Sequence, residues 1–165
     1  MMRIFALLAA GLIAACSPQG AAETQATSAV AADAASPDVH PVSGLEVVPL
    51  TVTGRSGTHK FEVEVARTAQ EQARGLMFRT ELGPNEGMIF PYKDARQLGF
   101  WMKDTPLPLD IIFIGVDGRI NNIAAMTTPY STESVYSTGF ANLVLEIPGG
   151  RAAELGIQPG DLVEY

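Results

Sequence analysis

From residue 45 onward, apolar and polar positions alternate in short runs of the kind that form half-buried β-strands. Residues 60–65 alternate most cleanly, with Phe61, Val63 and Val65 on one face and charged side chains on the other. Residues 109–116 are apolar at most positions, which predicts a central strand that is covered on both faces. Further strands are predicted at residues 45–52, 87–92, 98–103, 120–126, 143–148 and 162–165.

Turn and capping signals separate these runs. Asp117-Gly118 is typical of a type I′ hairpin turn, because these residue types tolerate the positive φ angles that the turn requires. Thr68 and Glu71 have the spacing of a capping box, in which each side chain accepts a hydrogen bond from the other residue's amide. They predict a short helix that ends at Gly75.

Together these elements predict a single mainly β domain at residues 45–165. The pattern favours a small barrel-like or folded-over sheet of about seven to eight short strands with one or two short helices. A helical turn at residues 152–155 would be the second helix.

The amino terminus reads as a targeting segment, with residues 1–15 predicted to be a signal peptide. A basic start precedes an apolar run that is shorter than the roughly 20 residues a membrane-spanning helix needs. The run ends in Ile13-Ala14-Ala15-Cys16, which resembles the lipobox of bacterial lipoproteins and makes Cys16 the predicted lipidation site. The alternative is an ordinary secreted protein, cut near an Ala-x-Ala site, in which Cys16 is incidental.

The lipoprotein hypothesis predicts a membrane anchor at Cys16 and a place in the bacterial cell envelope, on the periplasmic side. Ser17 after the cysteine resembles the sorting signal that directs lipoproteins to the outer membrane. Residues 16–44 are then a lipidated, disordered tether, because they are rich in Ala, Pro and Ser and contain no aromatic residue, Leu or Ile. His40, beside Pro41, is expected to be a solvated linker residue.

Charge and residue counts narrow the function classes. The chain has 11 basic and 18 acidic residues, a formal net charge of −7, and no basic run, which argues against nucleic acid as a partner. A single cysteine excludes an internal disulfide or a CxxC site, and two histidines leave little room for a His-based metal centre or a catalytic triad. No cofactor is predicted.

Seven motifs in order along residues 47–165 resemble domain of unknown function family 192. They are Gly75-Leu76-Met77-x-Arg79, Gly87-Met88-Ile89-Phe90, Phe100-Trp101-Met102-Lys103-x-Thr105, Leu109-Asp110-Ile111-Ile112-Phe113, Asp117-Gly118, Leu145-Glu146 and Gly160-Asp161. The resemblance implies a small β-barrel-like domain, often behind a signal or lipoprotein leader, and it implies no activity. The chain departs from the family pattern at Asp104, where Asn is usual and where a carboxylate lacks the donors of an amide.

Asp110 is the most unusual residue of the domain, because it lies within the apolar run 109–116. A carboxylate there must be paired, hydrogen-bonded or protonated, and Lys103 and Arg79 are its candidate partners. One interpretation is structural: Asp110 accepts backbone amides at the proline-rich bend before it, or forms a buried ion pair. The other is functional, a perturbed carboxylate in a cleft.

Glu146 falls out of phase with the apolar residues around it, which predicts an exposed position on a half-buried strand. If Glu146, Asp104 and Asp110 nevertheless converged, they could serve glycan hydrolysis or hold Ca²⁺ or Mg²⁺. Trp101 is either a platform on which a sugar stacks or one more packed ring.

Two functions follow from these candidates. The first is a non-enzymatic binding or accessory module for a small polar molecule, glycan or envelope protein, with a cleft lined by Arg79, Trp101, Lys103 and Asp110. The alternative is a carboxylate-dependent hydrolase of envelope glycan, in which Asp110 is acid or base and Glu146 or Asp104 is its partner.

Overall fold

The computed structural model describes residues 38–165. Nine strands and two short helices follow one another along the chain. They are β1 (Val47–Gly54), β2 (Gly57–Val65), α1 (Ala69–Arg74), β3 (Glu86–Arg96), β4 (Gly99–Phe100), β5 (Leu109–Ile114), β6 (Ile120–Ala124), β7 (Val135–Tyr136), β8 (Ala141–Pro148), α2 (Arg151–Leu155) and β9 (Leu162–Glu164). The predicted mainly β fold is therefore confirmed.

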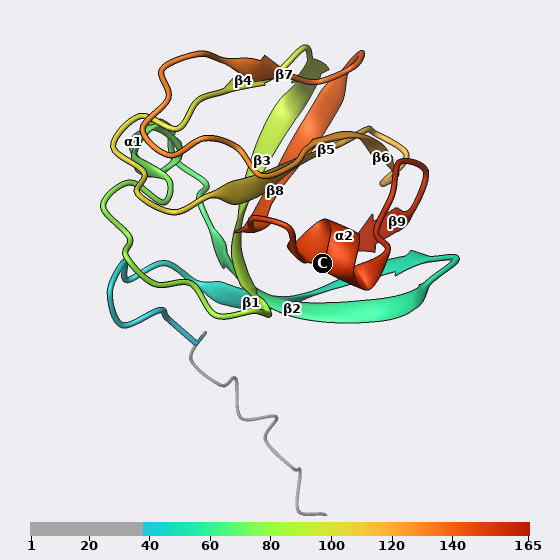
Figure 1. Ribbon diagram of the computed structural model, residues 1–165, viewed down its shortest axis with the longest axis horizontal. Helices are drawn as coiled ribbons and strands as arrows, with labels where there is room; N and C mark the ends of the chain where they lie inside the picture. The colour runs from blue at the N-terminus through green and yellow to red at the C-terminus, as the bar shows by residue number, and fades with distance from the viewer. Residues whose placement is uncertain (1–37) are drawn as a thin grey trace, which may run out of the picture. The chain divides into compact units, whose positions relative to one another are not determined.

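Seven of the strands form one sheet in the order β6-β5-β8-β3-β2-β1-β9, and β4 and β7 form a separate pair (Figure 1). Neighbouring strands are antiparallel except β2 and β3, which run parallel and are joined through α1. The sheet folds over so that its two edges approach each other, and a single bridge joins Arg119 to Leu162. No continuous ladder joins β6 to β9 in the described chain, so the sheet is folded over without closing into a barrel.

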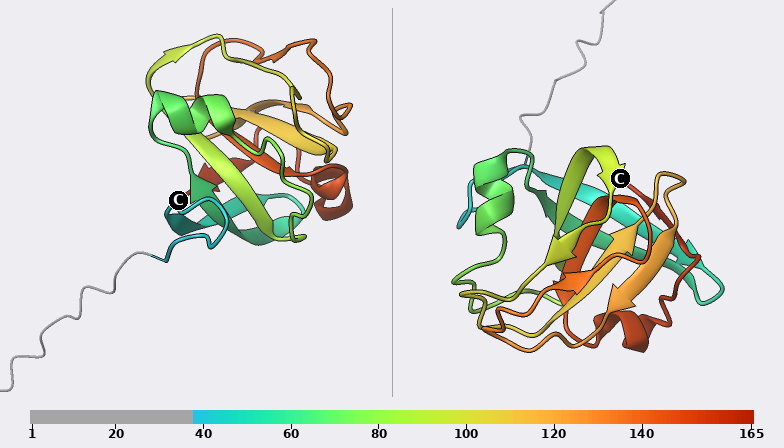
Figure 2. Two further views of the ribbon diagram at one scale, coloured as in Figure 1. Left: turned by 90° about the vertical axis from the view of Figure 1, so that its left-hand side faces the viewer. Right: turned by 90° about the horizontal axis from the view of Figure 1, so that it is seen from above.

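Each face of the sheet carries its own apolar core. The first core lies inside the fold and includes Leu50, Phe61, Val63, Ile89, Ile112, Ile114, Leu145, Ile147 and, from α2, Ala152. The second core lies on the opposite face and includes Met88, Phe90, Met102, Ile111, Phe113 and Val144. The segments around α1 and the β4–β7 pair cover this second face (Figures 1 and 2). The central strands therefore need apolar residues on both sides.

The capping box at the start of α1 forms as predicted. The Thr68 side chain accepts a hydrogen bond from the Glu71 amide, and the Glu71 carboxylate accepts one from the Thr68 amide. Residues 109–116 were predicted to contain a central strand, and all six residues of β5 are buried between β6 and β8. The predicted strand at residues 98–103 shrinks to Gly99–Phe100, because the residues that follow turn away to cover the second core.

The ordered domain begins before residue 45. Val39 forms a bridge with Glu46, and the Val47 amide donates to the Asp38 carbonyl. The expectation that His40 is a solvated linker residue is wrong, since its side chain is 18% exposed and lies beside Glu64. Composition could not predict this contact, because Glu64 lies on β2, far from His40 in the sequence.

Cys16 and the predicted signal peptide lie outside the described residues. Within residues 38–165, neither helix is long and apolar enough to cross a membrane.

Candidate functional site

Glu146 is a buried acid in the middle of β8. Its partners across the neighbouring strands are Met88 and Ile111, so its side chain lies on the face of the second core. The residue is only 4% exposed, and the prediction that it lies on an open strand face is wrong. The alternation of β8 was interpreted correctly, but its second face is covered by other segments of the chain.

The Glu146 carboxyl makes no hydrogen bond or ion pair within residues 38–165, and burial raises its pKa to about 8. An ordinary glutamate ionises near 4.5, so this group keeps its proton at neutral pH. Burying a carboxyl without a partner costs free energy, and such groups gather at functional sites.

The carboxyl borders a small cavity, which we call the Glu146 pocket, of about 170 Å³. Its wall combines four aromatic rings with several polar side chains. The rings are Phe90, Tyr92, Phe100 and Trp101, and the polar residues besides Glu146 are Gln72, Arg74, Lys103 and Thr105.

The end of α1 forms one wall of the pocket. Gln72 donates through Nε2 to the carbonyls of Ala66 and Pro91, at 3.2 and 2.9 Å, which fixes its carboxamide. Its Oε1 accepts no hydrogen bond within the described chain. Gly75 then turns the chain at a φ of +48°, and a Cβ there would lie 3.4 Å from the Phe90 ring. That distance is an ordinary van der Waals contact, so it is the positive φ angle that favours glycine here.

The aromatic wall is held by ring contacts. Phe100 packs edge-on against Phe90 and Phe113, with centroid distances of 5.0 and 6.1 Å. Trp101 is 49% exposed. Burial raises the pKa of the Tyr92 hydroxyl, and the guanidinium of Arg96 lies 4.6 Å from the centre of the Tyr92 ring. The pocket therefore has a packed interior and an accessible aromatic edge.

Asp110 has a structural environment on the other face of the sheet. It is 0% exposed and accepts three backbone amides, from Met126 at 2.8 Å, Gly150 at 2.9 Å and Ala152 at 2.8 Å. These bonds join the segment after β6 and the start of α2 to β5. Of the three expectations for Asp110, an ion pair, hydrogen bonds or a proton, the structure shows hydrogen bonds, and the amides come from these distant segments and not from the bend before it.

The structure does not bring Asp110 and Glu146 together. Asp110 lies opposite Ile147, and consecutive residues of a strand point to opposite faces, so Glu146 and Asp110 lie on different sides of the sheet. Asp104 pairs with Lys103 at 2.7 Å and does not line the Glu146 pocket. Among residues 38–165, no three His, Cys, Asp or Glu side chains gather as metal ligands would.

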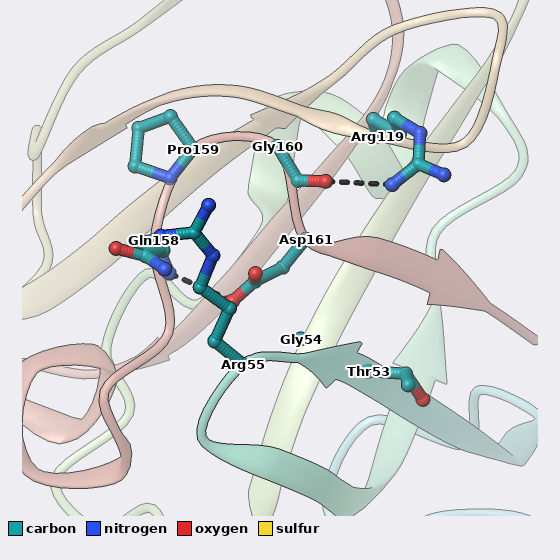
Figure 3. Close-up of a pocket in the computed structure, with 8 residues that line it drawn as sticks. All are labelled: Thr53, Gly54, Arg55, Arg119, Gln158, Pro159, Gly160 and Asp161. Carbon is teal, nitrogen blue, oxygen red and sulfur yellow. Dashed lines mark hydrogen bonds between the residues drawn. The ribbon is translucent and has the colours of Figure 1, made fainter.

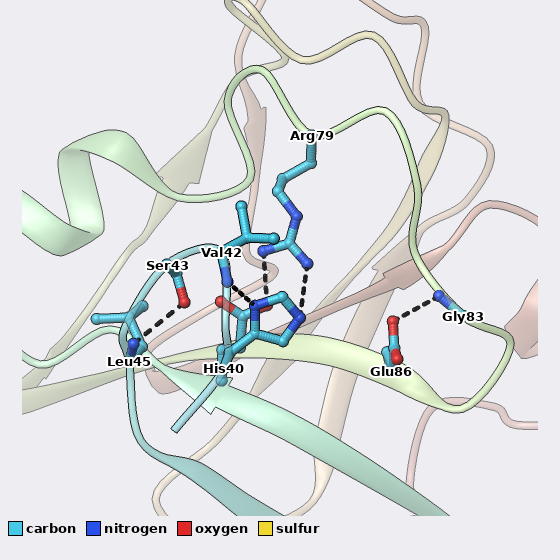
Figure 4. A network of polar contacts seen from close by, with 8 residues as sticks. His40, Val42, Ser43, Leu45, Arg79, Gly83 and Glu86 are labelled. Carbon is cyan, nitrogen blue, oxygen red and sulfur yellow. Dashed lines mark hydrogen bonds and ion pairs between the residues drawn. The ribbon is translucent and has the colours of Figure 1, made fainter. Parts of the chain in front are cut away.

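Arg79 is engaged elsewhere, in the network of Figure 4. Its Nη1 donates to Glu64 Oε1 at 2.8 Å, and its Nη2 lies 3.2 Å from Nε2 of His40. Both Arg79 and Glu64 are largely buried, and the second Glu64 oxygen, Oε2, has no hydrogen-bond partner in the described chain. Of the four predicted binding residues, only Trp101 and Lys103 therefore line the Glu146 pocket.

The shallow cavity in Figure 3 lies where the two edges of the sheet meet. Arg119 donates to the Gly160 carbonyl at 2.8 Å, and Asp161 accepts the Gln158 amide at 3.0 Å. A Cβ on Gly54 would overlap the Asp161 carboxylate, so glycine is required at the end of β1. The terminal Gly160-Asp161 motif thus has a structural role.

Two residues with strained backbones directly follow, in the sequence, residues that line the Glu146 pocket. Phe78 and Asp104 have φ angles of +64° and +54°, and the Phe78 amide donates to the Asp104 carbonyl at 2.8 Å. Asp and Asn are the non-glycine residues that best tolerate this region. The departure from the family pattern at Asp104 therefore preserves the backbone conformation, and strain of this kind is common beside functional sites.

Gln72 and Tyr92 were not predicted as site residues, and Glu146 was predicted to be exposed although it is buried. One signal was available: residues 143–147 read Leu-Val-Leu-Glu-Ile, a nearly continuous apolar run typical of a strand buried on both faces. An acid inside such a run is as unusual as Asp110.

Comparison with known families and structures agrees with the fold. The model of the family DUF192, described as "Uncharacterized ACR", matches residues 50–165. The chain belongs to this family. None of the curated proteins matches it.

Two crystal structures are similar to this DUF192 protein. A protein of unknown function from Novosphingobium aromaticivorans DSM 12444 is 58% identical, with a TM-score of 0.77, over 80% of this chain and 94% of that one. A protein from Sinorhizobium meliloti 1021, described provisionally as a transcription regulator, is 36% identical, with a TM-score of 0.71, over 73% of this chain and 94% of that one.

Proposed function

We propose that this DUF192 protein is an envelope-anchored lipoprotein whose domain binds a small polar molecule in the Glu146 pocket. The observation that carries the binding role is the Glu146 carboxyl: the residue is buried, the carboxyl has no partner among residues 38–165, and its oxygens are open to the cavity. A polar group in that position is costly unless something supplies its missing hydrogen bonds. A ligand in the cavity would do so.

The shape and composition of the pocket support binding rather than hydrolysis. Cavities that bind small molecules are mostly apolar with a few convergent polar groups, as here. Among residues 38–165, Glu146 is the only acid in the wall, so these residues do not assemble in the pocket the pair of carboxylates used in glycan hydrolysis. Trp101, half exposed, is placed to cover a bound molecule.

Trp101 is the only tryptophan in the chain, so its fluorescence reports directly on the pocket. We would use the chain carrying Cys16→Ser, which leaves the domain intact, and titrate it with monosaccharides, amino acids, amines, carboxylates and polyols. The expected result is a saturable fluorescence change with at least one class, which Glu146→Leu abolishes and the exposed Glu81→Gln does not. The proposal fails if no class produces a change, or if the change persists in Glu146→Leu.

The anchor rests on Cys16 and the apolar run before it. Metabolic labelling with a palmitate analogue is expected to label the wild-type chain in the membrane fraction and to leave Cys16→Ser unlabelled. An unlabelled wild-type chain would favour the alternative of ordinary secretion, and it would leave the pocket hypothesis unaffected.

A further inference from the structure

The polar atoms of the Glu146 pocket match a ligand that donates hydrogen bonds at its inner end. Gln72 uses its nitrogen on two backbone carbonyls, so the atom it has left to offer is Oε1, an acceptor. Glu146, once ionised, offers two acceptor oxygens and a negative charge. These groups favour a ligand with several N–H donors.

The aromatic rings favour a cation at the same place. Phe90, Tyr92, Phe100 and Trp101 line one small cavity together with a carboxyl group. The face of an aromatic ring attracts an ammonium ion, and the attraction grows when water is excluded. Aromatic cages recognise organic ammonium groups, and an ionised carboxyl beside the rings adds a charge with which such a group can pair.

The outer edge of the pocket favours an anionic group of the ligand. Lys103 is paired with Asp104, and Arg74, on the last turn of α1, makes no ion pair or side-chain hydrogen bond within residues 38–165. Arg74 is exposed and lines the pocket. A guanidinium there suits the carboxylate end of a ligand.

We propose that the Glu146 pocket binds a zwitterion of amino-acid size, with its ammonium group on the Glu146 carboxylate and its anionic group at Arg74. This inference rests on the proposed function, because it names the ligand class of the same site. The cavity volume of about 170 Å³ limits the ligand to a small molecule.

Binding of an ammonium ion releases a proton. In the empty pocket burial raises the pKa of Glu146 to about 8, so at pH 6 the carboxyl is protonated. When the ammonium ion enters, the carboxyl loses its proton to the buffer and the ion pair forms, and close to one proton is released per ligand. Proton release declines above pH 8, because Glu146 is then already ionised in the empty pocket. Burial raises the pKa of the Tyr92 hydroxyl in the same wall, so that group keeps its proton over this range.

The experiment is isothermal titration calorimetry at pH 6 and pH 9, in pairs of buffers with different ionisation enthalpies. Four probes share a four-carbon chain: γ-aminobutyrate, n-butylammonium, butyrate and n-butanol. We expect γ-aminobutyrate to bind at least tenfold more tightly than n-butylammonium, with close to one proton released at pH 6. Butyrate and n-butanol are expected to bind more weakly than either.

Two variants separate the two ends of the ligand. Glu146→Gln keeps the shape of the side chain and should weaken both ammonium probes at least tenfold and abolish proton release. Arg74→Gln should weaken γ-aminobutyrate and leave n-butylammonium unchanged, and Lys60→Gln, an exposed position on β2, serves as the control.

The possible failures are distinguishable. If butyrate, n-butanol or a neutral sugar binds best and Glu146→Gln weakens it, the pocket is a ligand site and the zwitterion inference is wrong. If ammonium probes bind without proton release, the inference is also wrong. If no probe binds and Trp101 fluorescence responds to no compound class, the inference and the proposed function fail together.

Discussion

The pH dependence of unfolding tests whether Glu146 is unpartnered in the folded protein. Its pKa rises on folding from an ordinary 4.5 to about 8, so the folded state holds the proton more tightly than the unfolded chain does. This contribution to stability is complete below pH 4.5 and is lost as the pH rises toward 8. The loss amounts to about 1.4 kcal/mol per pH unit, or about 3 kcal/mol between pH 4.5 and pH 7.

Glu146→Gln removes this titration and keeps the side chain's size. We expect the free energies of unfolding of wild type and variant to be similar at pH 4.5 and to diverge by about 3 kcal/mol at pH 7, with the variant the more stable. Urea denaturation at four pH values between 4.5 and 7.5 measures the difference. The contributions of all other titrating groups are the same in both proteins and cancel in this difference.

The control is Glu81→Gln, which changes an exposed carboxylate and should follow the wild-type pH dependence. A difference between Glu146→Gln and wild type that stays constant with pH would refute the reasoning. Glu146 would then ionise normally, and the case for an incomplete site would be lost.

Three further substitutions test the framework around the pocket, each by urea denaturation at pH 7. Asp110→Asn should lower the free energy of unfolding by about 2–4 kcal/mol, because an amide cannot accept all three backbone amides; a neutral effect would contradict the anchoring role. Arg79→Met should cost about 3–5 kcal/mol by stranding the buried Glu64, and the double variant with Glu64→Met should recover most of that loss. A double variant whose loss equals the sum of the two single losses would show that the residues are not coupled. Thr68→Ala should cost about 1 kcal/mol, against no loss for Thr80→Ala, an exposed loop position whose hydroxyl makes no hydrogen bond within residues 38–165.

The elements that depend on local patterns were predictable from the sequence. The capping box needs only Thr68 and Glu71 at the right spacing, and the clean alternation of residues 60–65 needs only a strand with one buried face. In the same way, the apolar run around residues 109–116 could only be a strand covered on both faces.

The site itself was less predictable, because it is assembled from distant segments. Alternation shows which residues share a face with Glu146, but not that α1 and the β4–β7 pair cover that face. For Asp110 the need for partners was predictable, but the partners are backbone amides, which leave no signature in the sequence. His40 and Arg79 were misjudged for the same reason, since both depend on Glu64 from another part of the chain.

The pairing of the last strand with the first has a consequence for the order of events during synthesis. β9 lies against β1 through Val163 and Val52, and the bridge at Leu162 brings the sheet edges together. Because β9 is synthesised long after β1, the edge of β1 that β9 covers stays open until β9 has been made. Exposed strand edges invite pairing with other chains, so the docking of β9 also protects the domain from aggregation.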